Sequence, residues 1–130
     1  MIKGCKVKEA ELSNAIDIYA LLKDAIKEGI YPEGEAPTDK ELQHYYMAGL
    51  LPELKSPYHK YWIAQRGRGY LGYLHAIFTP DVWTQSKYSM LIEMVYVVEK
   101  RRKHGIGKGL IDAAKGFAAD NNIEKIVLLG

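Results

Sequence analysis

The chain has 130 residues, 48% of them hydrophobic and 26% charged, which is typical of a single globular domain over residues 1–130. The 18 lysines and arginines nearly balance the 16 aspartates and glutamates. The net charge of +2 therefore predicts neither a nucleic-acid-binding nor a membrane-associated protein. One cysteine, Cys5, cannot form an internal disulfide, and the first residues lack the apolar run of a signal peptide. We therefore expect a cytoplasmic protein.

The N-terminal part of the chain predicts a short strand followed by a helix. The candidate strand is Lys3–Lys8. From Glu11 onward, apolar residues recur every three or four positions, which is the spacing of one helix face. Gly29 is expected to end this helix, because glycine adopts the left-handed conformation at a helix end at little cost. The residues that this spacing assigns to the buried face are Leu12, Ile16, Tyr19, Leu22 and Ile26.

A second helix is predicted over Asp39–Leu51, after a loop at residues 30–37 that contains two prolines and a glycine. Thr38 and Glu41 have the spacing of a capping box, in which each side chain accepts a hydrogen bond from the other residue's backbone. Pro52 is expected to end this helix.

Strand patterns dominate the middle of the chain. Tyr61–Gln65 and Tyr70–Phe78 are expected to form a hairpin around a glycine-containing turn. Asp81–Lys87 is polar and is predicted to be a loop. Met90–Val98 is almost entirely apolar and rich in valine, which indicates a strand buried on both faces.

The C-terminal part predicts one more helix and one more strand. Helical spacing returns after Gly105 and ends at Asn122, and Ile123–Leu129 is the last predicted strand. The order of elements is strand, helix, helix, three strands, helix, strand. This order predicts an α/β or α+β fold.

The turn between the buried strand and the last helix carries the chemistry. The first N–H groups of a helix have no partner within the helix, and glycines allow a phosphate to approach them closely. Gly105 and Gly107 lie at this point, and basic residues surround them. The Walker pattern fails, because Gly109 follows Lys108 where serine or threonine is required. The dinucleotide pattern Gly-x-Gly-x-x-Gly fails as well.

The turn does match Arg/Gln-x-x-Gly-x-Gly, as Arg102–Gly107, directly after a strand that contains Val95-Tyr96-Val97. This combination resembles the coenzyme A signature of the GNAT-type N-acetyltransferase superfamily. The resemblance implies a mixed central sheet of about five strands flanked by three helices, and acetyl-CoA as the cosubstrate. It also implies backbone pairing of the pantetheine arm with Val95, Tyr96 and Val97. The diphosphate would be held by Arg102, Lys103, His104, Gly105, Ile106, Gly107 and Lys108.

Glu93 is the one carboxylate in the Met90–Val98 run. Acetyl transfer requires a neutral amine, and a carboxylate can remove its proton directly or through a water molecule. Glu93 is therefore the candidate catalytic base or amine-binding group. The alternative is a structural role, in which Glu93 faces solvent or pairs with a lysine or arginine.

Members of this superfamily usually continue with a further helix and two strands, which carry a tyrosine that protonates the leaving thiolate. This chain stops at Gly130, so it is expected to be either a fragment or a short relative, and no general acid is assigned. Without the further strands, the apolar edge of Ile123–Leu129 would be exposed, which favours a homodimer or strand exchange at that edge.

Three functions remain open from the sequence. The first is an acetyl-CoA-dependent N-acetyltransferase that acts on an amine of a small molecule or peptide. The second is a non-catalytic acyl-CoA-binding or interaction module, and the third is nucleic-acid binding through Lys100–His104, which the small net charge disfavours. No metal site is predicted, because the histidines lack metal-ligand spacing; they are His44, His59, His75 and His104. Tyrosines are expected around the acceptor side, either lining a pocket or packing at the surface; they are Tyr31, Tyr45, Tyr46, Tyr58 and Tyr61.

Overall fold

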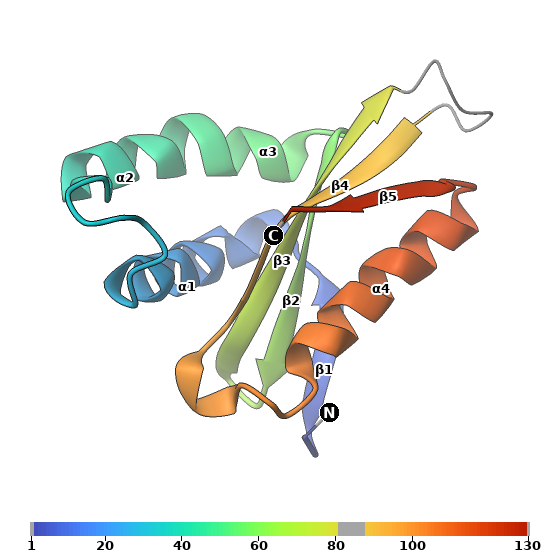
Figure 1. The fold of residues 1–130 in the computed structure, drawn as a ribbon, viewed down its shortest axis with the longest axis horizontal. Coiled ribbons are helices and arrows are strands. Elements are labelled where there is room, and N and C mark those ends of the chain that lie inside the picture. The colour runs from blue at the N-terminus through green and yellow to red at the C-terminus, as the bar shows by residue number, and fades with distance from the viewer. Residues whose placement is uncertain (1, 81–87, 130) are drawn as a thin grey trace.

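One five-stranded sheet forms the centre of the molecule (Figure 1). The computed structural model describes residues 2–80 and 88–129, so the loop predicted at Asp81–Lys87 lies outside the described residues. The strands follow one another in sequence order across the sheet. The pairs β1–β2, β2–β3 and β3–β4 are antiparallel, and β4–β5 is parallel. The strands are β1 (Cys5–Glu9), β2 (His59–Arg66), β3 (Gly69–Pro80), β4 (Tyr88–Val97) and β5 (Lys125–Leu128).

Helices cover both faces of the sheet. Helix α1 and the continuous helical segment α2–α3 lie on one face, and α4, which forms the crossover between the parallel strands β4 and β5, lies on the other (Figure 1). This arrangement confirms the predicted mixed sheet and order of elements. Among the described helices, none is long and apolar enough to cross a membrane. The helices are α1 (Ala15–Lys27), α2 (Asp39–Tyr45), α3 (Leu51–Lys55) and α4 (Ile106–Asp120).

The buried face of α1 differs from the predicted one. Ile16, assigned to the core from its spacing, is 60% exposed, and Leu12 is 45% exposed in a 3-10 turn before the helix. The prediction was wrong because the face that packs on the sheet lies one position earlier along the helix than the predicted face, with alanines sharing it with Ile18 and Leu21. The residues that α1 buries are Ala15, Ile18, Leu21 and Ala25.

The second helix begins as predicted but does not end at Pro52. The Glu41 N–H donates to Thr38 Oγ1 over 3.1 Å, and the Thr38 N–H donates to Glu41 Oε1 over 3.0 Å, which completes the capping box. A π-helical turn at Tyr46–Leu50 then leads into α3, where Pro52 occupies the first turn. Proline lacks an N–H donor, and the wider π-helical turn directly before it is the local irregularity with which the helical segment passes it. The helical segment therefore continues to Lys55.

Alternation along the strands divides the core into two layers. Side chains such as Trp62, Leu74 and Met90 pack against α4 on one face. Side chains such as Tyr61, Ile63 and Tyr73 pack against α1 on the other. Both faces of β4 are therefore covered, as its apolar sequence indicates.

Candidate active site

Strand β4 pairs with β5 only over its first part. Their register runs from Ser89↔Lys125 to Ile92↔Leu128, and the Leu129 N–H donates to the Ile92 carbonyl over 3.0 Å. Figure 1 shows that β4 continues beyond this point between α1 and α4. Over this continuation, β3 is the only strand that pairs with β4 within the described residues. The second edge of β4 is therefore open there.

The open edge presents the backbone of two valines. The Val98 N–H donates to the Leu71 carbonyl on the β3 side over 2.8 Å. Because successive residues of a strand direct their backbone groups to opposite edges, those of Val97 and Val95 face away from β3. An extended ligand can pair with these groups as an added strand would.

A β-bulge in β4 determines where Glu93 lies. His75 pairs with Met94 and Ala76 pairs with Ile92, so Glu93 is an additional residue without an opposite partner. The extra residue places Glu93 and Met94 together on the face of α1, where both line a cavity. Val95, the next residue, packs in the layer of α4.

The glycine turn leads directly into the N-terminus of α4. Gly105 precedes the helix with a φ of 80°, a left-handed conformation that glycine adopts readily. The Gly109 N–H donates to the Gly105 carbonyl over 3.0 Å. The N–H groups of Ile106, Gly107 and Lys108 precede that bond, at the positive end of the helix dipole. This geometry suits an anion such as a diphosphate.

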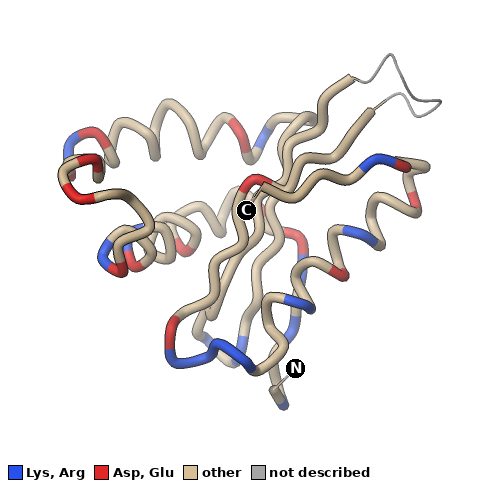
Figure 2. Tube along the Cα trace, in the orientation of Figure 1, with Lys and Arg blue, Asp and Glu red and all other residues tan. Residues whose placement is uncertain are grey.

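Lysines and arginines are concentrated in the turn between β4 and α4 (Figure 2). Lys103 and His104 are exposed, and Lys108 Nζ lies 2.7 Å from Asp112 Oδ2. Lys103 has a φ of 66°, a conformation that residues with a Cβ rarely adopt. The structure thus brings the predicted diphosphate-binding residues to one place.

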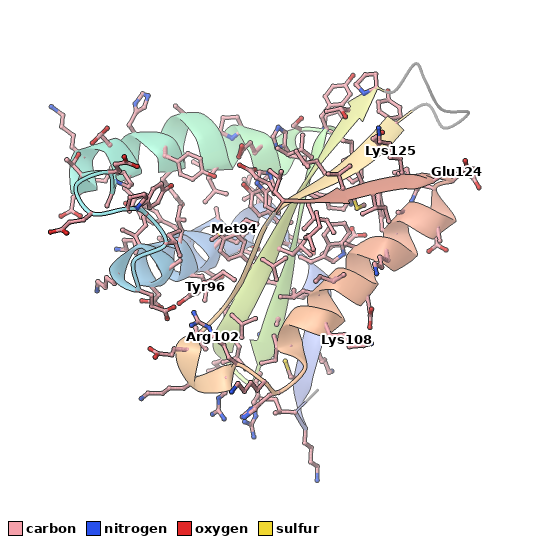
Figure 3. The ribbon with its side chains drawn as sticks, viewed as in Figure 1. Met94, Tyr96, Arg102, Lys108, Glu124 and Lys125 are labelled. Atoms are coloured by element: carbon pink, nitrogen blue, oxygen red, sulfur yellow. The ribbon has the colours of Figure 1, made fainter. Side chains whose placement is uncertain are left out.

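Arg102 is held by groups on two other elements. Its Nε donates to the Val97 carbonyl over 3.1 Å, and its guanidinium pairs with Glu28 at the C-terminal end of α1. The Tyr96 hydroxyl also donates to Glu28, over 2.8 Å. Figure 3 shows Tyr96 and Arg102 close together beside this end of β4. The hydrogen bond from Tyr96, together with the pairing to Arg102, lowers the pKa of Glu28.

A cavity of about 320 Å³ lies on the α1 side of the sheet, at the level of the bulge. Its walls contain carboxylates and tyrosines, and among the described lining residues there is no lysine or arginine. Two tyrosines expected near the acceptor side, Tyr46 and Tyr58, are not part of this lining. The acidic residues are Glu41, Glu53 and Glu93, and the tyrosines are Tyr31, Tyr45, Tyr61 and Tyr73.

Glu93 is paired with a histidine, a partner that the sequence did not indicate. His75 Nδ1 lies 2.7 Å from Glu93 Oε2, and the side chain of Glu93 is 46% exposed. Burial, reinforced by nearby His59, lowers the pKa of His75 to about 3. A neutral His75 therefore donates a hydrogen bond from Nδ1. Burial, reinforced by the charge of Glu53, raises the pKa of Glu93.

Two further residues of the site, Tyr73 and Glu53, were not predicted from the sequence. Tyr73 is a core residue of β3 that also lines the cavity, and Glu53 belongs to the helical extension beyond Pro52. His75 did carry a signal, because apart from two tyrosines it is the one ionisable side chain in the apolar run of β3. The ring of Tyr61 stacks on the ring of His75, with centroids 4.1 Å apart, and so helps to fix its position.

A mixed sheet in which β4 extends past its parallel partner β5 and leads through a glycine turn into a helix N-terminus is the arrangement expected of an acyl-CoA N-acyltransferase fold. The family model described as "Acetyltransferase (GNAT) family" matches residues 18–130. The chain therefore belongs to the GNAT acetyltransferase family. No curated protein sequence matches the chain.

Solved structures share this fold at low sequence identity. A predicted acetyltransferase with acetyl-CoA from Clostridium acetobutylicum is 23% identical, with a TM-score of 0.73 over 97% of this chain and 80% of that one. A transcriptional regulator from Bacillus halodurans C-125 is 22% identical, with a TM-score of 0.79 over 97% and 81%. An aminoglycoside acetyltransferase from an uncultured soil metagenomic sample, in complex with sisomicin, is 17% identical, with a TM-score of 0.77 over 98% and 78%.

Proposed function

We propose that this protein transfers an acetyl group from acetyl-CoA to an amine that is cationic in solution. The observation that carries the proposal is the position of Glu93. The β4 bulge places this carboxylate in the acidic cavity on one face of the sheet, next to the open edge of β4. One residue thus lies where a bound thioester and a bound amine would meet.

The donor side would hold acetyl-CoA in an extended form. Backbone groups of Val95 and Val97 would pair with the pantetheine arm, and the Val97 carbonyl would then be shared with Arg102 Nε, from which it accepts a hydrogen bond over 3.1 Å. The diphosphate would lie at the N-terminus of α4, among the residues of Arg102–Lys108. Arg102 would then have to share its guanidinium between Glu28 and the diphosphate.

The acceptor side favours a positively charged amine. Three carboxylates line the cavity without a lysine or arginine among the described lining residues, so their field attracts cations. Tyrosine faces add cation–π attraction for an ammonium group. Family membership and the relatives that act on amines, such as the aminoglycoside acetyltransferase, support this choice of acceptor.

The residues present suggest the following chemistry. Glu93 removes a proton from the ammonium group, directly or through a water molecule. The neutral nitrogen then attacks the thioester carbonyl, and backbone N–H groups on the splayed strand stabilise the oxyanion. A C–N bond forms, the C–S bond breaks, and coenzyme A leaves as the thiolate. Transfer of the proton to this thiolate is assigned to no residue of the chain.

Calorimetric titration with acetyl-CoA and with free CoA tests the donor side. We expect both ligands to bind, and absence of binding at high ligand concentration would refute the proposal.

A panel of monoamines, polyamines, aminoglycosides and peptide amines, assayed by release of the CoA thiol, tests the acceptor side. Binding without turnover of any amine would favour the alternative, a non-catalytic acyl-CoA-binding module.

A further inference from the structure

Three metal-binding side chains meet beside the cavity, although they come from three different elements. Glu53 belongs to α3, His59 begins β2, and His75 lies in β3. His59 Nδ1 is 2.9 Å from His75 Nε2 and 3.7 Å from Glu53 Oε1, and all three donor atoms lie within 4.8 Å of one another. Donors around a tetrahedral zinc ion, each about 2.0–2.2 Å from the metal, lie about 3.3 Å apart. Two of the observed separations, 2.9 and 3.7 Å, lie on either side of that value, and the third is within 4.8 Å.

The partners of these ligands are those that a metal site requires. A histidine that binds metal usually donates its second N–H to a carboxylate, which fixes the ring and its tautomer. His75 makes this contact through Nδ1 to Glu93 Oε2, over 2.7 Å, so Nε2 faces His59 with its lone pair. The second oxygen of Glu53 accepts a hydrogen bond from the Tyr61 hydroxyl over 3.0 Å. Two of the three ligands are therefore held in place by neighbouring side chains.

The cluster also has the charge and access that a cation needs. Glu53 and His75 line the acidic cavity, so a fourth coordination position would open into it. Three protein ligands and one open position are typical of reactive zinc sites, whereas structural zinc sites are closed by four ligands. Two imidazoles with one carboxylate favour zinc, cobalt or nickel over magnesium or calcium.

We propose that Glu53, His59 and His75 form a binding site for a divalent transition metal of the zinc class, open to the acceptor cavity. This proposal departs from the expectation drawn from the sequence, which found no metal-ligand spacing among the histidines. The spacing of these residues along the sequence does not indicate a metal site, because strand pairing and the continuation of the helix past Pro52 bring the ligands together. The proposal does not depend on acetyl transfer.

Metal-free protein, prepared with a chelator, is titrated with Zn²⁺ by calorimetry and with Co²⁺ by visible spectroscopy. We expect one equivalent to bind and cobalt to show the strong bands of a four-coordinate site. His59→Ala and Glu53→Gln should each weaken binding by more than about tenfold, since loss of even an outer partner costs about 10–100-fold. Both side chains are only half-buried, so these variants should fold, which circular dichroism checks.

The exposed His44, outside the cluster, serves as the matched control. His44→Ala should leave the metal affinity and the cobalt spectrum unchanged. Failure of the wild-type protein to bind Zn²⁺ or Co²⁺ would overturn the proposal and leave a hydrogen-bonded cluster only. Equal weakening by the control variant and by His59→Ala would also overturn it, because it would show adventitious surface binding. Acetyl-CoA affinity, measured on the same samples, reports separately on the proposed function.

Discussion

At the scale of single residues, one inserted position determines the geometry around Glu93. In regular alternation, Glu93 and Met94 would face opposite sides of the sheet. The bulge places both on the α1 side and shifts Val95 to the α4 side. The bulge at Glu93 and Met94 thus supplies the cavity with a carboxylate. It also determines which backbone groups of β4 face the open edge.

The proposed base can be tested by Glu93→Gln. We expect turnover with an acetylated amine to fall by about 10²–10⁴-fold, the range of general base catalysis. Acetyl-CoA binding should barely change, because the donor side relies on the backbone of β4 and on Arg102–Lys108. Thiol-release kinetics and calorimetry measure the two quantities, both in the presence of a chelator. Unchanged turnover would exclude Glu93 as the base.

Lys103 is in a left-handed conformation, with a φ of 66°. This conformation costs a residue with a Cβ about 1–2 kcal/mol. Glycine has more conformational freedom in the unfolded chain, which lowers the free energy of unfolding by about 0.5–1 kcal/mol. We therefore expect Lys103→Gly to raise the free energy of unfolding by about 0.5–1 kcal/mol in denaturant titrations.

Lys100→Gly is the matched control for Lys103→Gly. Lys100 lies in the neighbouring 3-10 turn, Glu99–Arg101, and has no positive φ. Glycine should therefore lower stability at that position, and the same direction of change in both variants would contradict a strained Lys103.

At the scale of elements, the approach of β3 to β4 depends on Gly72. A Cβ at this position would lie 2.5 Å from the Tyr96 carbonyl oxygen, closer than atoms can pack. Gly72→Ala should therefore displace β4 where it presents Val95 and Val97, at a cost of about 1–3 kcal/mol. Acetyl-CoA binding should weaken with it.

Gly116→Ala provides the control in α4, where a Cβ would meet no atom within 4 Å. Alanine should stabilise this helix by about 0.5–1 kcal/mol, as measured by thermal unfolding. If Gly72→Ala also failed to lower the stability, the close approach of β3 to β4 would not require glycine at this position.

At the scale of the whole molecule, β5 lies at one edge of the sheet that the described residues form, and apolar residues at its C-terminal end are exposed. Val127, Leu128 and Leu129 are 39%, 57% and 55% exposed. An apolar edge strand is a template for pairing with a second chain. We predict a homodimer through this edge, detectable by size-exclusion chromatography with light scattering.

Leu128→Lys should convert the predicted dimer to a monomer, because a charged side chain disfavours pairing at a strand edge. Ile16→Lys is the control, since Ile16 is 60% exposed on α1, away from β5. A wild-type protein that stays monomeric at high concentration would contradict a dimer at this edge.

The sequence by itself determined the order of the elements and the family, because these depend on local patterns. Apolar spacing located the helices and strands, and the capping box located the start of α2. The turn at Arg102–Gly107 is contiguous, so its resemblance to a coenzyme A signature is visible without a structure. Apolar periodicity did not predict which face of α1 is buried, as the exposure of Ile16 shows, because packing against the sheet selects that face. It also did not predict the π-helical turn that continues the helix past Pro52.

Only the tertiary structure decided what surrounds Glu93. His75 is 18 positions away along the chain and faces Glu93 because β3 and β4 pair around a bulge. Glu53 and the tyrosines reach the same cavity from segments that are separate in sequence. The pairing of Arg102 with Glu28 joins residues 74 positions apart. Local patterns carry no information on such contacts, because they form when distant segments pack together.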